Sequence, residues 1–213
     1  NAVNSCFCFK SYFRVFNAII GSPALDIYVN ELLLAANLKY GEFSRYLKFM
    51  PGEYRVTAYP SGNQKKAVLE TNIVIGKNLV YTGALTGQIN NIEDLSILMI
   101  PDEKVNQFMN GMSAVKVINL IPGSVSYDLV AEDGTVLFSD IKYGDISIDV
   151  AIPSGRYKLY LRKKGDDKNL LTVPSIDFAP RMYYKLFIIG EHDETPKIEM
   201  IIPEDGLNYL DLC

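Results

Sequence analysis

Short runs of hydrophobic residues recur along the chain, separated by polar residues and turn formers. Runs such as "LDIYV", "EYRVTAY" and "KIEMIIP" alternate or cluster β-branched and aromatic residues, and Gly, Pro, Asn or Asp bounds them. Turn signals return roughly every 8 to 12 residues, a spacing typical of antiparallel sandwiches. No 11-residue window has its apolar residues at the spacing of an amphipathic helix, so the pattern predicts an all-β fold.

The whole pattern occurs twice. "FRVFNAIIGSPALDIYV" begins at Phe13 and "VKVINLIPGSVSYDLVA" begins at Val115, and the two align residue for residue. One residue is then inserted in the second copy, and the register continues through "NLKYGEFS" at 37 to 44 and "DIKYGDIS" at 140 to 147. A register held over this length indicates an internal duplication.

This duplication predicts the domain organisation. We expect two tandem antiparallel β-sandwiches, immunoglobulin-like or transthyretin-like, at residues 11–101 and 114–204. Residues 102–113, "DEKVNQFMNGMS", interrupt the hydrophobic pattern with polar residues and are the expected linker. In the second copy, Asp133-Gly134 predicts a two-residue hairpin turn.

The repeated eight-residue phrase is the candidate binding feature. Tyr40 and Tyr143 each precede a glycine, and each is followed by an acid and an expected strand beginning at Phe43 or Ile146. A repeated strand-to-strand corner explains the phrase, since glycine supplies a backbone conformation that other residues resist. A ligand site present in both copies also explains it. The binding candidates are Tyr40, Tyr143, Lys39 and Lys142.

The two copies resemble a tandem-repeat bacterial family known only as a domain of unknown function. Its copies open with R-V-x-N/H-A-S-P-x-A-P-x-V-D-V-Y-V-N-G and continue to a P-A-G-x-Y turn, as "RVFNAIIGSPALDIYVNE" and "PGEY" do here. The resemblance covers about Tyr12 to Pro203. It implies an all-β module, often of the cell envelope or spore, with no known activity. Glu31 follows Asn30 where the family has Gly, so the first hairpin turn is expected to be built differently.

Composition narrows the possible partners. The 213 residues are 48% hydrophobic and 22% charged, which is typical of a globular protein. A net charge of -4 supplies no cationic surface for nucleic acid, and no apolar run reaches the roughly 20 residues of a membrane-spanning helix. The 14 tyrosines, with no tryptophan, are suited to an adhesive sheet face or to the core.

The search for catalytic chemistry is mostly negative. His192, the only histidine, lies in "EHDE", which is expected to be a solvated turn; a weak metal or catalytic site is the alternative. Asp26 and Asp128 recur at matched positions, as simple duplication would produce if their side chains bind loop backbone. Three cysteines at the chain ends, Cys6, Cys8 and Cys213, provide no disulfide framework for the cores, and a bridge from Cys6 or Cys8 to Cys213 stays open.

Two functional hypotheses follow. We favour a non-catalytic structural or binding module of the bacterial cell envelope or spore that contacts protein or glycan, without cofactor, metal ion or catalytic residues. The alternative is an accessory domain with a weak metal or catalytic site near His192. The absence of a G-x-S-x-G motif and of a second histidine favours the first hypothesis.

Overall fold

The computed structural model describes residues 10–212 except 105–107, 109, 124 and 193–194. The chain forms two compact units: residues 1–104 with 209–213, and residues 105–208. Cys6, Cys8 and Cys213, and hence any bridge among them, lie outside the described residues. The boundaries expected from the repeat, 11–101 and 114–204, remain a prediction.

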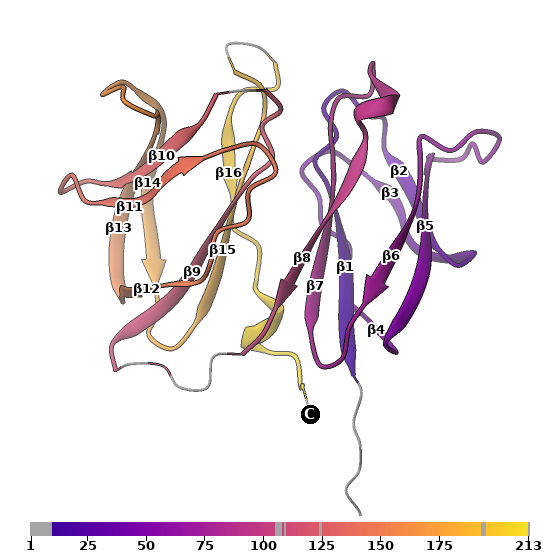
Figure 1. Ribbon diagram of the computed structural model, residues 1–213, viewed down its shortest axis with the longest axis horizontal. Coiled ribbons are helices and arrows are strands. Elements are labelled where there is room, and N and C mark those ends of the chain that lie inside the picture. Colours follow the sequence, from indigo (N-terminus) through magenta and orange to yellow (C-terminus); the bar gives the residue numbers. More distant parts are fainter. Residues whose placement is uncertain (1–9, 105–107, 109, 124, 193–194, 213) are drawn as a thin grey trace, which may run out of the picture. The chain divides into compact units, whose positions relative to one another are not determined.

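The first unit is a sandwich of two four-stranded sheets (Figure 1). One sheet has the order β4-β1-β7-β8 and the other has the order β3-β2-β5-β6. The strands are β1 (Ser11–Asn17), β2 (Leu25–Val29), β3 (Leu32–Leu38), β4 (Leu47–Phe49), β5 (Gly52–Pro60), β6 (Leu69–Ile75), β7 (Val80–Thr86) and β8 (Ser96–Asp102).

The second unit repeats this topology strand for strand. Its sheets have the orders β12-β9-β15-β16 and β11-β10-β13-β14, so each strand occupies the place of its counterpart in the first unit. The strands are β9 (Met112–Asn119), β10 (Tyr127–Ala131), β11 (Val136–Ile141), β12 (Val150–Pro153), β13 (Gly155–Lys163), β14 (Asn169–Phe178), β15 (Tyr183–Ile189) and β16 (Glu199–Ile201).

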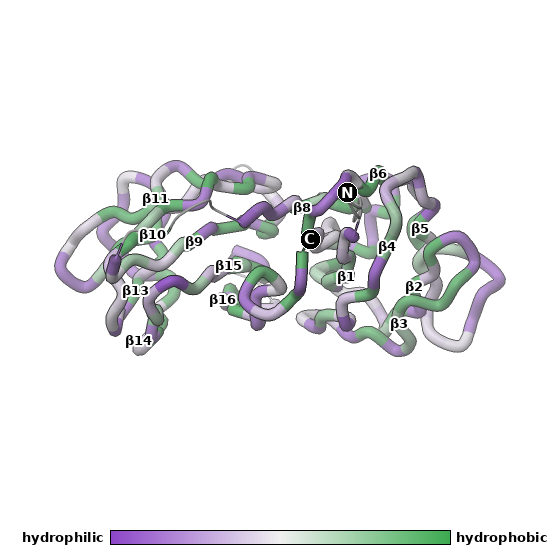
Figure 2. Tube along the Cα trace, turned by 90° about the horizontal axis from the view of Figure 1, so that it is seen from below, coloured by the Kyte–Doolittle hydropathy of each residue, from purple (hydrophilic) through white to green (hydrophobic). Residues whose placement is uncertain are grey.

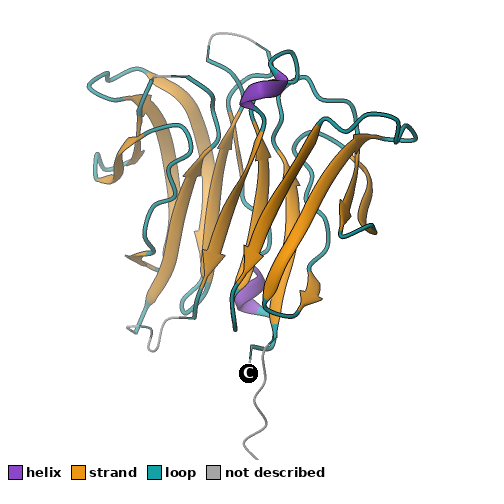
Figure 3. Ribbon diagram, turned by 45° about the vertical axis from the view of Figure 1, so that its right-hand side comes forward, coloured by secondary structure: helices purple, strands orange, loops and turns teal. Residues whose placement is uncertain are grey.

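The prediction of two tandem β-sandwiches is confirmed, with one refinement. The pairs β1–β7 and β9–β15 are parallel, whereas the other strand pairs of the described sheets are antiparallel. Helical structure among the described residues is limited to two short 3-10 turns, η1 (Ile92–Asp94) and η2 (Gly206–Asn208), as Figure 3 shows. In the described part of the chain, no helix has the length and hydrophobicity that a bilayer crossing requires.

Alternation along the strands builds each core. In β2 every second side chain is buried, so Leu25, Ile27 and Val29 point into the sandwich and the side chains between them point outward. Leu129 and Leu161 occupy corresponding inward positions in the second unit. Hydrophobic residues accordingly recur along the strands of both copies (Figure 2). Full burial of such a side chain contributes about 2 kcal/mol, and the repeated pattern supplies one core per copy.

One glycine is required at the same place in each copy. Gly87 and Gly190 follow β7 and β15 with φ of 113° and 114°. A Cβ on Gly190 would lie 2.5 Å from the carbonyl oxygen of Lys197, and a Cβ on Gly87 would lie 2.9 Å from that of Asp94. Both positions therefore need glycine for close backbone approach as well as for the positive φ.

The C-terminal segment belongs to the first unit. The Tyr12 hydroxyl donates to the Asp211 carbonyl (3.3 Å), and the Tyr46 and Tyr209 rings meet edge to face at 6.4 Å. The last residues of the chain are therefore part of the first sandwich, although they follow the second copy in sequence.

Candidate functional site

The repeated phrase forms the same backbone corner twice. In the first copy, Gly41 N–H donates to the Asn17 carbonyl (2.8 Å), and Lys39 N–H donates to Glu42 Oε2 (2.8 Å). The counterpart bonds of the second copy run from Gly144 to Asn119 (2.9 Å) and from Lys142 to Asp145 Oδ2 (2.8 Å). Gly41 and Gly144 have φ of 79° and 81°. These matched bonds account for the repetition of the phrase without a ligand.

The expected strands after the phrase are not formed. Phe43 and Ile146 make only isolated bridges, to Phe16 and Ile118, and regular strands resume later, at β4 and β12. The prediction was wrong because the chain turns tightly after the glycine and approaches the neighbouring strand at a single residue. Tyr40 and Tyr143 are half-buried, and Lys39 and Lys142 are exposed. A ligand-binding role for these four residues stays a prediction.

The matched aspartates hold a bulged strand. Asp26 Oδ1 accepts hydrogen bonds from Asn37 N–H and Ser61 Oγ (both 2.8 Å), and Asp26 Oδ2 accepts one from Gly62 N–H (3.0 Å). The Asn37 and Gly62 donors lower the pKa of the Asp26 carboxyl. Asn37 has a φ of 55°, in the left-handed region, and the Asp26 carboxylate accepts the hydrogen bond from its backbone N–H within β3.

Asp128 has the same role in the second copy. Its Oδ1 accepts a hydrogen bond from the N–H of Asp140 (2.8 Å), a residue with φ of 58°, and another from Ser139 Oγ (2.8 Å). Duplication therefore preserved this pair for folding, as the matched positions predict.

Repeated tyrosines also bind their own backbone. The Tyr54 hydroxyl donates to the Met50 carbonyl (2.8 Å), and the Tyr157 hydroxyl donates to the Pro153 carbonyl (2.7 Å). Tyr81 and Tyr184 form a second matched pair, each accepting a backbone N–H at 2.9 Å. The fold thus explains why these two pairs of tyrosines recur in both copies.

His192 is less exposed than a solvated turn would place it. It is half-buried, both ring nitrogens are shielded from solvent, and its ring centroid lies 6.4 Å from that of buried Tyr127. His192 lies in a turn, as predicted, but the prediction that it is solvated was wrong, because the imidazole packs near the tyrosine ring. Asp193 and Glu194 lie outside the described residues. The described residues contain no group of three potential metal ligands.

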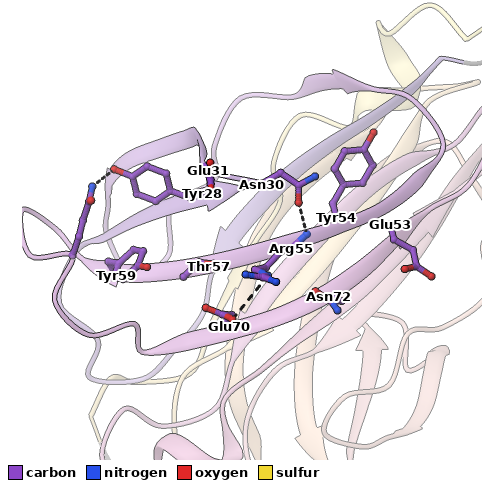
Figure 4. Close-up of a pocket in the computed structure, with 11 residues that line it drawn as sticks. Tyr28, Asn30, Glu31, Glu53, Tyr54, Arg55, Thr57, Tyr59, Glu70 and Asn72 are labelled. Atoms are coloured by element: carbon purple, nitrogen blue, oxygen red, sulfur yellow. Dashed lines mark hydrogen bonds and ion pairs between the residues drawn. The ribbon is translucent and has the colours of Figure 1, made fainter.

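The outer face of the β3-β2-β5-β6 sheet holds a depression of about 730 Å³. Alternate residues of β5 point toward it, and their cross-strand partners on β2 and β6 complete its floor. Figure 4 shows these side chains on the outer surface of the sheet. The lining residues are Tyr28, Asn30, Glu31, Glu53, Tyr54, Arg55, Thr57, Tyr59, Gln64, Glu70 and Asn72.

Two of the three tyrosines that line the depression have no counterpart in the second copy. Tyr28 on β2 and Tyr59 on β5 meet edge to face, with ring centroids 5.9 Å apart and planes at 81°. Gln64, from the loop between β5 and β6, donates a hydrogen bond to the Tyr28 hydroxyl. Arg55 lies 4.0 Å from Glu70 across the strand pair. The depression thus combines ring surfaces with amide, guanidinium and carboxylate groups.

The β2–β3 turn places Glu31 at this depression. Val29 pairs with Leu32, so Asn30 and Glu31 alone connect the strands, with φ of 46° and 69°. Arg55 N–H donates to Asn30 Oδ1 (2.8 Å). This is the two-residue turn that Asn-Gly would form, with Glu31 in the glycine position. The expectation of a differently built turn was wrong, because the sheet imposes the conformation on a residue that disfavours it.

The corresponding turn of the second copy is one residue longer. Gly134 N–H donates to the Ala131 carbonyl (2.9 Å), and Ala131 N–H donates to the Thr135 carbonyl (2.8 Å), so three residues connect the strands. The two-residue turn predicted from Asp133-Gly134 was therefore wrong. Gly134 takes the positive φ, 89°, in a three-residue loop, and the insertion inferred from the alignment lies here.

The second copy has a different outer sheet face. Tyr160 lies there between two cations, with Lys158 Nζ 5.4 Å and Arg162 Cζ 5.6 Å from its ring centroid. Lys158 also pairs with Glu132 (3.2 Å), and Arg162 donates to Asn169 (2.7 Å). The positions of Tyr28 and Tyr59 are taken by Val130 and Arg162, so the two-ring arrangement is confined to the first copy.

Sequence reasoning did not identify this depression. It selected candidates from repeated residues, whereas the lining residues of the depression other than Tyr54 are ones that the copies do not share. The available signal was Tyr28 and Tyr59, at outward positions of predicted strands where the second copy lacks tyrosine. The pairing of β2 with β5, which brings the two rings together, was not predicted.

Comparisons with known proteins give one clear match. A family model, described as Domain of unknown function (DUF4397), matches residues 11–112 and again residues 113–208. No curated protein matches.

Solved structures show only distant similarity. The Bacillus anthracis TIE protein is 10% identical over 85% of this chain, with a TM-score of 0.27, and the chain spans 34% of its length. The CBM26 module of Eubacterium rectale Amy13K, in complex with maltoheptaose, is 8% identical, with 92% and 97% of the two chains covered and a TM-score of 0.25. A streptococcal virulence factor described for alpha-glucan binding is 12% identical, with 94% and 100% covered and a TM-score of 0.26.

Proposed function

The chain belongs to the family described as Domain of unknown function (DUF4397) through both of its halves, and from this premise we propose that it is a non-catalytic binding module. Its first copy holds a glycan in the depression on the outer face of the β3-β2-β5-β6 sheet. The second copy is a structural partner with a different outer face. The location that the sequence resemblance implies, the bacterial cell envelope or spore, is part of this proposal.

The observation that carries the proposal is the pair of perpendicular rings among polar side chains. A sugar ring presents an apolar C–H surface on its faces and hydroxyl groups around its edge. Tyr28 and Tyr59 offer flat, rigid, amphipathic surfaces for the apolar part, at low cost in side-chain entropy. Asn30, Gln64 and Asn72 offer donors and acceptors for the hydroxyls.

The composition of the depression favours a glycan over an apolar small molecule. Pockets for apolar ligands are lined mainly by aliphatic and aromatic side chains with few polar groups. Here, eight of the eleven lining residues are polar or charged and the remaining three are tyrosines. An extended peptide would pair with the backbone of an edge strand such as β6, whereas the two tyrosine rings lie on β2 and β5, which are both paired on each side.

The proposal is tested by binding to an array of neutral, amine-bearing and acidic oligosaccharides, followed by calorimetry on those retained. We expect Tyr28→Ala to weaken binding about tenfold, because it removes one of the two ring surfaces. Tyr160→Ala, on the outer face of the second copy, is the matched control and should bind like the parent. No cleavage of the bound oligosaccharide is expected.

Two results would contradict the proposal. One is an array on which no oligosaccharide is retained. The other is binding that Tyr28→Ala and Tyr160→Ala weaken equally, which would remove the assignment to the first copy. Accessibility of the native protein to a membrane-impermeant label on intact cells or spores tests the proposed location separately.

A further inference from the structure

The charges around the depression carry one inference beyond the proposed function, on which it rests. Arg55 and Glu70 lie 4.0 Å apart and offset each other. The side-chain carboxylates of Glu31 and Glu53 form no hydrogen bond or ion pair with any other residue that the structure describes. The lining of the depression therefore includes two carboxylates that no described cation offsets, Glu31 at the β2–β3 turn and Glu53 near the start of β5.

Glu31 occupies its position at a cost in backbone energy. The left-handed region at φ of 69° disfavours residues with a Cβ atom, and glutamate lacks the short side chain that lets asparagine tolerate this region. The second copy avoids the cost with a longer turn in which Gly134 takes the positive φ. The first copy thus keeps a carboxylate at the rim of the depression where glycine would be more stable.

We infer that the site selects a glycan that carries protonated amines, such as a de-N-acetylated hexosamine polymer, over neutral and acidic glycans. Glu31 and Glu53 attract ammonium groups at separate points along the glycan, because Glu53 lies six residues from Tyr59 along β5, about 20 Å away. The faces of Tyr28 and Tyr59 bind the sugar rings between them. An acidic glycan meets like-charge repulsion at the same two carboxylates. Glu31 is the proposed specificity-determining residue.

The test compares two oligosaccharides that differ only in acetylation: a β-1,4-linked glucosamine tetramer and its fully N-acetylated counterpart. We expect the amine-bearing tetramer to bind at least about fivefold more tightly at neutral pH and low salt, the effect of one exposed charge pair near its upper range. Glu31→Gln should reduce this preference to less than about twofold, leaving the affinity for the acetylated tetramer unchanged. The preference should also decline as the pH rises through the pKa of the amines.

Asp167→Asn, in the exposed β13–β14 loop of the second copy, makes the same change in net charge and is the matched control. Loss of the preference in this variant would show a general charge effect and overturn the inference. Equal binding of the two tetramers to the parent also overturns it, but leaves the proposed glycan site intact. If neither tetramer binds, the inference is contradicted, and the oligosaccharide array alone then decides the proposed function. Equally tight binding of an oligolysine peptide would overturn selection of a sugar.

Discussion

The two copies share a scaffold but differ on one face. On the β3-β2-β5-β6 sheet of the first copy, Tyr28 and Tyr59 lie beside a depression with two uncompensated carboxylates. On the matching sheet of the second copy, Tyr160 lies between Lys158 and Arg162. The difference indicates that positions kept in both copies maintain the fold, while the outer sheet faces have diverged in sequence; a difference in binding is our proposal.

The largest effect is expected where the copies agree. Tyr40→Ala should destabilise the first copy, and Tyr143→Ala the second, by about 2 kcal/mol each, because truncating a half-buried ring removes part of the 3–5 kcal/mol of a fully buried one. Hydrogen exchange followed by peptide mass spectrometry assigns the loss of protection to one copy. Variants that keep parental protection but lose binding to a cell-wall or spore extract would show instead that the corner is a recognition site.

A smaller effect of opposite sign is expected where the turns differ. Glu31→Gly should stabilise the first copy by about 1 kcal/mol, because glycine removes the strain at positive φ. In the second copy, Glu132→Gly should be neutral or destabilising, since Glu132 does not have a positive φ. Urea unfolding measures both changes. Destabilisation by Glu31→Gly would contradict the prediction and would show that the glutamate side chain stabilises the turn.

The smallest effect concerns acid. Hydrogen bonds from Asn37 and Gly62 lower the folded-state pKa of Asp26, so its contribution to stability is present above the unfolded pKa of about 3.9 and is lost as the pH falls through the folded value. Stability of the first copy should therefore decrease as the pH falls below about 4, and Asp26→Asn should make this dependence shallower. The measurement is urea unfolding at a series of pH values. An unchanged pH slope in Asp26→Asn would assign the acid sensitivity to other carboxyls.

Much of the fold could be predicted from local sequence. Alternation in "LDIYV" identifies β2 and its inward face, because successive strand residues point to opposite sides of a sheet. The matched positions of Asp26 and Asp128 predict that both side chains accept hydrogen bonds from the backbone, since duplication keeps residues that the fold requires. The turns were less predictable. Asn30-Glu31 forms a two-residue turn although it lacks glycine, and Asp133-Gly134 lies in a three-residue loop although its sequence is typical of a two-residue turn. In both hairpins the flanking strands set the loop length.

The sequence by itself determined the repeat, the strand content and the residues that each copy needs in order to fold, because these depend on periodicity and on local turn chemistry. Only the tertiary structure decided which strands are neighbours. The pairing of β2 with β5 brings Tyr28 beside Tyr59, and contacts with Tyr12 and Tyr46 place the C-terminal residues in the first unit. The candidate site depends on such long-range contacts, which no local pattern encodes, because its side chains come from separate strands and become neighbours only when the sheet forms.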